Sequence, residues 1–151
     1  SYTIVPKELT FAVSDGRRMS LHDMWNRRQS TKFNGTPYII QYAAAQVLSE
    51  EGMEECMENI SYYMENARVI AETLRRKNIP FTGGVNSPYI WFKCPDGMES
   101  WELFDHLLEK IQVVGTPGAG FGVNGKYHFR LTSFGTHEKT KEAMKRFEQL
   151  F

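Results

Sequence analysis

The sequence predicts an α+β fold in which a small sheet is covered by helices. From about residue 50 onward, helix and strand patterns follow in the order helix, strand, helix, strand, strand, helix. Hydrophobic residues make up 41% and charged residues 24% of the chain, a balance typical of a folded globular protein. The 151 residues suffice for one domain, or for a small domain with part of another, and the pattern places a boundary near Ser49.

Three elements are expected before that boundary. Residues 2–6 are extended and partly β-branched and predict a strand, and a chain that begins inside a strand suggests a fragment. Asp15-Gly16 indicates a turn, and residues 20–31 predict a short helix with Ser20 as its N-cap. Residues 36–48 predict a second helix, which is apolar over a broad face and is therefore expected to be well buried.

The strongest periodic signal predicts one long amphipathic helix from about residue 50 to Lys77. Acidic residues at its start and basic residues at its end suit the helix dipole, and Pro80 follows its end. Apolar residues recur along it at three- and four-residue steps: Met53, Cys56, Met57, Ile60, Tyr63, Met64, Ala67, Ile70, Ala71 and Leu74.

The segment after this helix predicts the sheet and two further helices. Aromatic and β-branched residues at 88–93 are typical of a strand. A short strand at 112–114, a glycine-rich loop at 115–125 and a strand at 127–132 follow. The two helices begin near Ser100 and near Thr136, and their expected buried residues are Trp101, Phe104, Leu107, Leu108 and Ile111 in the first and Ala143, Met144, Phe147 and Leu150 in the second.

Charge and hydropathy exclude several classes of function. Positive and negative side chains balance at 18 each, so no basic excess is available to neutralise a nucleic acid. The apolar runs are only a few residues long, whereas a membrane-spanning helix needs about 20, and the N-terminus does not resemble a signal peptide. We expect a cytoplasmic chain that binds neither nucleic acid nor a membrane.

The cysteines and histidines show no pattern typical of a metal site. Cys56 and Cys94 do not form a C-x-x-C pair, and the four histidines are scattered without ligand spacing. Cys56 falls on the apolar stripe of the long helix, so we expect it to be a small buried hydrophobe. Surface or structural roles are expected for the histidines, and no metal is expected.

Arg130 is the most informative candidate for a binding residue. Alternation in the predicted strand puts Tyr127, Phe129 and Leu131 on one face and Arg130 on the other. A guanidinium in the middle of a strand needs a partner, and its planar fork suits a carboxylate. One interpretation is therefore a receptor for a substrate carboxylate. The alternative, an internal salt bridge or a solvated face, is favoured by the pattern alone.

Two further segments admit both a functional and a structural interpretation. The backbone N–H groups of residues 115–122 suit an anion, but a strand and not a helix follows them, so the dinucleotide fingerprint is not matched. The pattern favours a conformationally demanding connection instead. Asn34 carries a donor and an acceptor that suit a binding site, but the pattern alone clearly favours a turn or cap residue before Gly35.

Taken together, these motifs resemble those of fold-type I pyridoxal-phosphate-dependent aminotransferases, and within them most closely the diaminopimelate aminotransferases. The resemblance runs in order along essentially the whole chain. The specific matches lie at residues 83–91 (G-G-V-N-S-P-Y-I-W), 113–122 (V-V-G-T-P-G-A-G-F-G) and 129–135 (F-R-L-T-S-F-G), with weaker ones at 2–9, 25–29, 31–35 and 62–67.

The resemblance implies a division of the chain and roles for two residues. Residues 1–49 correspond to the tail of the large cofactor-binding domain and residues 50–151 to the small C-terminal domain. Arg130 takes the role of the arginine that binds the α-carboxylate of the amino acid. Asn34 takes that of an asparagine near the active site of the neighbouring subunit, so a homodimer is implied. The implied cofactor is pyridoxal 5′-phosphate, and the implied substrates are an amino acid and a 2-oxo acid.

The resemblance also implies what this chain lacks. The family's Schiff-base lysine lies in a serine-rich S-x-x-K segment followed by glycine, and none of the nine lysines here has that context. We therefore expect no catalytic residue in this chain, a missing N-terminal half as its partner, and no activity of the chain alone. The alternatives are a stand-alone, non-catalytic module for carboxylate binding or association, and part of a lyase with the same fold.

Overall fold

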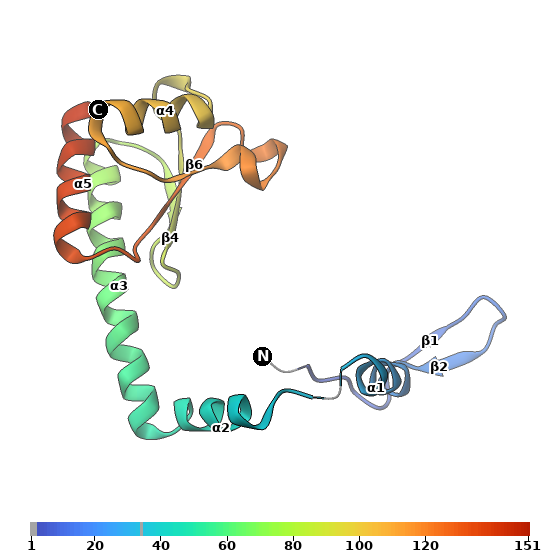
Figure 1. Cartoon of the computed structure of the whole chain (residues 1–151). Coiled ribbons are helices and arrows are strands. Elements are labelled where there is room, and N and C mark those ends of the chain that lie inside the picture. Colours follow the sequence, from blue (N-terminus) through green and yellow to red (C-terminus); the bar gives the residue numbers. More distant parts are fainter. Residues whose placement is uncertain (1–2, 34) are drawn as a thin grey trace. The chain divides into compact units, whose positions relative to one another are not determined.

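The computed structural model describes residues 3–33 and 35–151. It divides into two compact units, Ser1–Glu50 and Glu51–Phe151. The division lies within one residue of the start of the long helix α3 (Glu50–Arg76), so each unit is described by itself (Figure 1).

The first unit consists of a hairpin and two helices. Strands β1 (Thr10–Ala12) and β2 (Arg18–Ser20) pair antiparallel, and Val13 N–H donates to the Arg17 carbonyl (2.9 Å) to close the turn around Asp15-Gly16. The strand expected at residues 2–6 is wrong over the described residues 3–6, which have no regular structure. Pro6 has no N–H to donate to a ladder, and strand pairing begins only beyond it.

Helices α1 (Leu21–Lys32) and α2 (Tyr38–Val47) lie close to the predicted ranges. The prediction of Ser20 as N-cap is confirmed, since its hydroxyl accepts from the Asp23 N–H at 3.3 Å. The expected burial of the second helix is wrong, because none of its residues is buried and Ile39 is 72% exposed. The hydrophobic periodicity identifies an apolar face of α2, but burial also requires another element that packs against this face.

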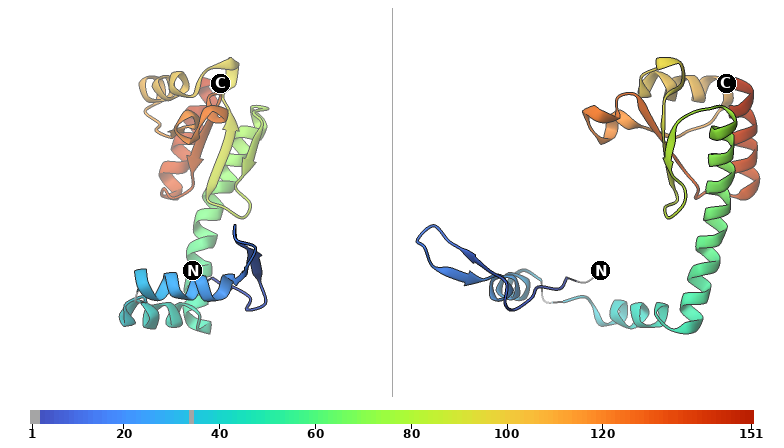
Figure 2. Two further views of the ribbon diagram at one scale, coloured as in Figure 1. Left: turned by 90° about the vertical axis from the view of Figure 1, so that its right-hand side faces the viewer. Right: turned by 180° about the vertical axis from the view of Figure 1, so that it is seen from behind.

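The second unit is a four-stranded antiparallel sheet with helices on one face (Figures 1 and 2). The strands lie in the order β3-β4-β6-β5. The two central strands, β4 and β6, are the longest. The strands and α-helices that follow α3 along the chain are β3 (Phe81–Gly83), β4 (Tyr89–Lys93), α4 (Ser100–Ile111), β5 (Thr116–Pro117), β6 (His128–Thr132) and α5 (His137–Leu150).

One face of the two central strands forms the core with all three helices. Ile90 and Phe92 of β4 and Phe129 and Leu131 of β6 point to this side, and each is at most 5% exposed. The helices contribute Ala67, Ile70 and Leu74 from α3, Leu103, Leu107 and Ile111 from α4, and Met144 and Phe147 from α5. The opposite face of the same strands consequently carries Tyr89, Trp91, His128 and Arg130.

Two predicted details of this unit are wrong. Gln112 is not in a strand but ends α4 in a left-handed conformation (φ 51°), and pairing starts at Thr116, opposite Arg130. The backbone needs this reversal before it can return to the sheet. Trp101 and Leu108, expected on the buried face of α4, are 58% and 43% exposed, because the stripe that reaches the core includes Leu103 instead.

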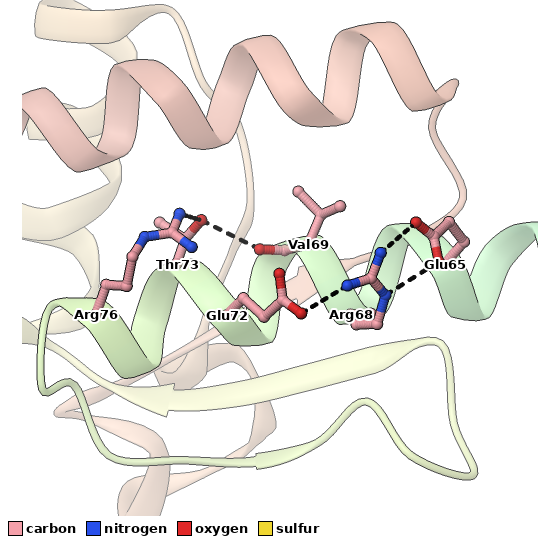
Figure 3. A network of polar contacts seen from close by, with 6 residues as sticks. All are labelled: Glu65, Arg68, Val69, Glu72, Thr73 and Arg76. Atoms are coloured by element: carbon pink, nitrogen blue, oxygen red, sulfur yellow. Dashed lines mark hydrogen bonds and ion pairs between the residues drawn. The ribbon is translucent and has the colours of Figure 1, made fainter.

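Ion pairs line the outer face of α3 (Figure 3). Arg68 donates to Glu65 (2.6 Å) and to Glu72 (2.7 Å), and the pKa of the Glu65 carboxyl lies below its usual value because of the hydrogen bond from Arg68. Arg76 donates to Thr73 and pairs with Glu148 of α5 at 2.7 Å. The paired side chains are 38–57% exposed, so these ion pairs add little to stability, and of the three only Arg76–Glu148 links α3 to α5.

Candidate carboxylate-binding site

Arg130 lies in the middle of β6, on the sheet face that carries no helix. It pairs across the sheet with Trp91 of β4 on one side and with Thr116 of β5 on the other. The alternation predicted for this strand is confirmed for Phe129 and Leu131, which are buried, while Arg130 is only partly buried. The guanidinium therefore stands on the open face at the centre of the sheet.

Two aromatic rings contact the Arg130 guanidinium. Its central carbon lies 4.6 Å from the centroid of the Tyr89 ring and 4.6 Å from that of the Phe121 ring. Tyr89 begins β4, whereas Phe121 comes from the short 3-10 turn Gly118–Phe121 in the glycine-rich loop. At such distances the negative ring faces attract the cation without neutralising its charge.

Within the described part of the second unit, Arg130 also differs from most other arginines in its partners. Arg68, Arg76 and Arg146 each pair with a carboxylate, at 2.6–2.8 Å. Arg130 forms no ion pair with any described residue, and its Nε is buried without a hydrogen-bond partner. The internal salt bridge, one of the two structural explanations, is therefore wrong for the described residues, and the fork is available for an external carboxylate.

Further aromatic rings pack against the two rings that contact Arg130. Trp91 stacks on His128 with centroids 5.5 Å apart and meets the Phe121 ring edge-on at 5.6 Å. Tyr89 meets Phe134 edge-on at 5.8 Å. An apolar wall of this kind lowers the local dielectric, so a carboxylate that reaches Arg130 is attracted more strongly than it would be in water.

The glycine-rich loop owes its composition to close packing. A Cβ on Gly118 would collide with the backbone carbonyls of Gly125 and His128, and one on Gly125 would collide with Gly118. The loop is also fixed to α4, since Ala119 N–H donates to the Ser100 hydroxyl at 3.2 Å. This packing supports the structural interpretation of the loop, and its consequence for the site is that Phe121 stands beside Arg130.

A family model described as aminotransferase class I and II matches residues 24–147. This chain belongs to that family. LL-diaminopimelate aminotransferase of Bacteroides thetaiotaomicron is 52% identical over 145 residues, which cover 96% of this chain and 35% of the relative, and that of Bacteroides fragilis gives the same values. The chain therefore spans about a third of the length of these curated relatives.

Solved structures of aminotransferases resemble the same stretch. L,L-diaminopimelate aminotransferase from Chlamydomonas reinhardtii superimposes with a TM-score of 0.82 at 36% identity, over 95% of this chain and 34% of that one. An aromatic aminotransferase from Pyrococcus horikoshii gives 0.70 at 25% identity, over 82% and 34%. The α+β fold and the family resemblance predicted from the sequence are thus confirmed.

Aminotransferases of this family depend on pyridoxal phosphate, but the lysines of this chain do not fit a covalent cofactor site. Eight of the nine are exposed, and the ninth, Lys77, is partly buried directly after the end of α3. Lys126 is paired with Glu99 at 2.7 Å, and this hydrogen bond raises its pKa above the usual value. A lysine that forms a Schiff base needs the opposite, a lowered pKa in an apolar setting.

The structure does not place the remaining candidates from the sequence at this site. Asn34 lies outside the described residues. Cys56 is partly buried and Cys94 buried, and both are free. The described residues include no cluster of three or more histidines, cysteines or carboxylates able to hold a metal ion. Nor does any helix among them have the length and apolar character needed to cross a membrane.

Sequence reasoning missed a polar network behind the site. Asn66 of α3 is completely buried, and its amide donates to the carbonyls of Ser133 (3.0 Å) and Gly135 (2.7 Å). Its oxygen accepts from His137 Nδ1 at 2.7 Å, and the His137 ring packs against the Tyr62 ring, with centroids 3.9 Å apart and planes tilted by 35°. The network fixes the turn that directly follows the Arg130 strand. The available signal was an asparagine next to Ala67 on an otherwise apolar helix face.

Proposed function

We propose that this chain is the C-terminal, substrate-carboxylate-binding part of a pyridoxal-phosphate-dependent aminotransferase that acts on LL-diaminopimelate. The observation that carries the proposal is Arg130, a partly buried guanidinium without a carboxylate partner among the described residues. The names of the Bacteroides and Chlamydomonas relatives support diaminopimelate as the amino acid. A 2-oxo acid is the proposed amino acceptor, and the cytoplasm the proposed location.

Arg130 would bind and orient the substrate. Because Nε is buried, an incoming carboxylate meets the terminal nitrogens Nη1 and Nη2, and two parallel hydrogen bonds fix its plane. Holding the carboxylate in this way leaves the amino group and α-carbon of the substrate in one defined orientation. The cofactor, when bound, supplies an electron sink for chemistry at that α-carbon.

The remaining parts of the proposal concern the parent protein. We assign residues 1–49 to the tail of its large domain and residues 50–151 to its small domain, which the division into two compact units supports. The resemblance of residues 31–35 to a turn of the family supports Asn34 as a contact to the site of a second subunit in a homodimer. The exposure of eight of the nine lysines supports the expectation that this chain alone does not transaminate.

Titration of the ¹⁵N-labelled chain with LL-diaminopimelate, followed by NMR, tests the carboxylate site. Binding is expected to perturb resonances on the open face around Arg130, and the dimethyl ester of the same compound, which lacks carboxylates, should not bind. Arg130→Ala should weaken binding about 10- to 100-fold, as expected for the loss of a charged bidentate contact. The matched control is Arg146→Ala, which removes an arginine that is paired with Glu142.

Two outcomes would contradict the proposal. If Arg130→Ala binds as tightly as the unaltered chain, Arg130 is not the carboxylate receptor. If the ester binds as well as the free acid, recognition does not depend on a carboxylate. Separately, measurable transamination by the purified 151-residue chain with added pyridoxal phosphate would refute its expected inactivity.

A further inference from the structure

We propose that Tyr89 and Phe121 are positioning residues that orient Arg130 for its carboxylate ligand. This inference rests on the proposed function, since it concerns how the same site achieves its geometry. An arginine side chain has many rotamers, and ordering it on binding reduces the affinity for its ligand. Rings that hold the guanidinium in place before the ligand arrives remove much of that cost.

The geometry of the two contacts supports such a clamp. Both ring centroids lie 4.6 Å from the central guanidinium carbon. The described residues include no ring contact between Tyr89 and Phe121, so the two rings approach the guanidinium from different directions. Together with the buried Nε, this arrangement leaves the Nη1–Nη2 edge as the part that faces a ligand.

Each ring of the clamp is itself held by another ring. Tyr89 meets Phe134 edge-on at 5.8 Å, and Phe134 in turn meets Tyr63 of α3 at 5.1 Å. Phe121 meets Trp91 at 5.6 Å. Tyr89 is therefore linked through Phe134 to α3, and Phe121 is linked through Trp91 to β4.

Exposure indicates that these rings are not primarily core residues. Tyr89 is 39% and Phe121 is 54% exposed, so neither gains full burial from its position. Phe121 stands at the end of the 3-10 turn in the glycine-rich loop, which is anchored by buried Gly118 and Gly125. A rigid loop that ends in a half-exposed phenylalanine beside a cation is better explained by the contact with that cation than by core packing.

The experiment compares leucine and aromatic replacements of Tyr89 and Phe121 by NMR of the Arg130 Nε–H signal. This signal is assigned to Arg130 because it disappears in the Arg130→Lys variant. Ring currents should shift this signal in the unaltered chain, and Tyr89→Leu or Phe121→Leu should return it toward the value of a free arginine. Affinity for LL-diaminopimelate should fall about 3- to 10-fold in each leucine variant, in line with one cation–π contact. Tyr89→Phe and Phe121→Tyr should keep both properties.

A control variant separates the clamp from a general effect of removing an exposed aromatic ring. Tyr127→Leu removes a 45% exposed ring that contacts the Lys126 ammonium at 5.3 Å, and it should change neither the Arg130 signal nor the affinity. The amide spectrum of each variant reports whether the fold is retained. The conservative variants Tyr89→Phe and Phe121→Tyr keep the test valid if a leucine variant does not fold.

The possible results distinguish this inference from the proposed function. If both leucine variants leave the Arg130 signal and the affinity unchanged while Arg130→Ala weakens binding, the clamp is overturned and the carboxylate role stands. If Arg130→Ala binds as tightly as the unaltered chain, the proposed function fails, and the clamp fails with it. Loss of affinity and of the ring-current shift in the leucine variants, with rescue by the aromatic ones, supports the clamp.

Discussion

Replacement of Asn66 by alanine tests whether the polar network behind the site stabilises the second unit. Asn66 is completely buried and takes part in three hydrogen bonds, with Ser133 and Gly135 as acceptors and His137 as donor. Ser133 is itself fully buried, so water cannot easily replace the amide there. The alanine variant therefore loses all three contacts and leaves at least one buried carbonyl without its side-chain partner.

The size of the effect follows from the number of contacts. A typical intramolecular hydrogen bond contributes a net of about 1 kcal/mol, which gives about 3 kcal/mol for the three. Alanine is the better helix former by roughly 0.6 kcal/mol, which offsets part of this loss. We expect the free energy of unfolding of the second unit to fall by about 2 to 3 kcal/mol.

The assay is urea unfolding followed by tryptophan fluorescence. Trp91 and Trp101 belong to the second unit and Trp25 to the first, so a Trp25→Phe background makes the signal specific to the second unit. Asn59→Ala is the matched control, because Asn59 lies on the same helix and is exposed, with only a local bond to Glu55 (3.1 Å). If the two variants differ by less than about 0.5 kcal/mol, the network does not stabilise the fold as argued.

Two other features give predictions with internal controls. Burial raises the pKa of the Cys94 thiol to about 11, so iodoacetamide at pH 8 should label Cys56 but not Cys94 until the chain is unfolded. Because this pKa is above the unfolded value of 9.0, the contribution of the protonated Cys94 thiol to stability is complete below pH 9 and is lost as the pH rises toward 11. Cys94→Ala should abolish this part of the pH dependence of the free energy of unfolding. In the glycine-rich loop, Gly118→Ala should lower the free energy of unfolding by about 1 to 3 kcal/mol, because the new Cβ would collide with backbone carbonyls. Gly120 faces open space, so Gly120→Ala should change the free energy of unfolding by less than about 0.5 kcal/mol. Equal effects of the two substitutions would contradict the packing argument.

The elements with a strong period were predictable from the sequence, and those that depend on a partner were not. The long helix, the strand at Tyr89 and the strand at Arg130 follow from patterns that the residues carry themselves. Strand β3 escaped prediction because it has only three residues and is specified by its pairing with β4. The expected strand at 112–114 failed for a similar reason, since the turn at Gln112 and not the β-branched residues decides where pairing begins.

The candidate site was predictable only in part. Alternation placed Arg130 opposite the core, and the family resemblance gave it a role. No spacing in the sequence pointed to Phe121, because its position beside Arg130 depends on how the loop between β5 and β6 folds back across the sheet. Asn66 was missed for a related reason, since its three partners lie 67 to 71 residues further along the chain.

The availability of Arg130 is itself a consequence of the fold, and it has a cost. Carboxylates neutralise Arg68, Arg76 and Arg146 of this unit on the helical side, where solvent also screens them. On the open face, the neighbours of Arg130 are rings, which attract a cation but accept no strong hydrogen bond from it. A partly buried donor left without an acceptor costs about 1 to 3 kcal/mol, so this arrangement lowers the stability of the folded chain. A carboxylate that binds at Nη1 and Nη2 would add the anionic acceptor that no described residue provides there, and this supports the proposed carboxylate role over a purely structural one.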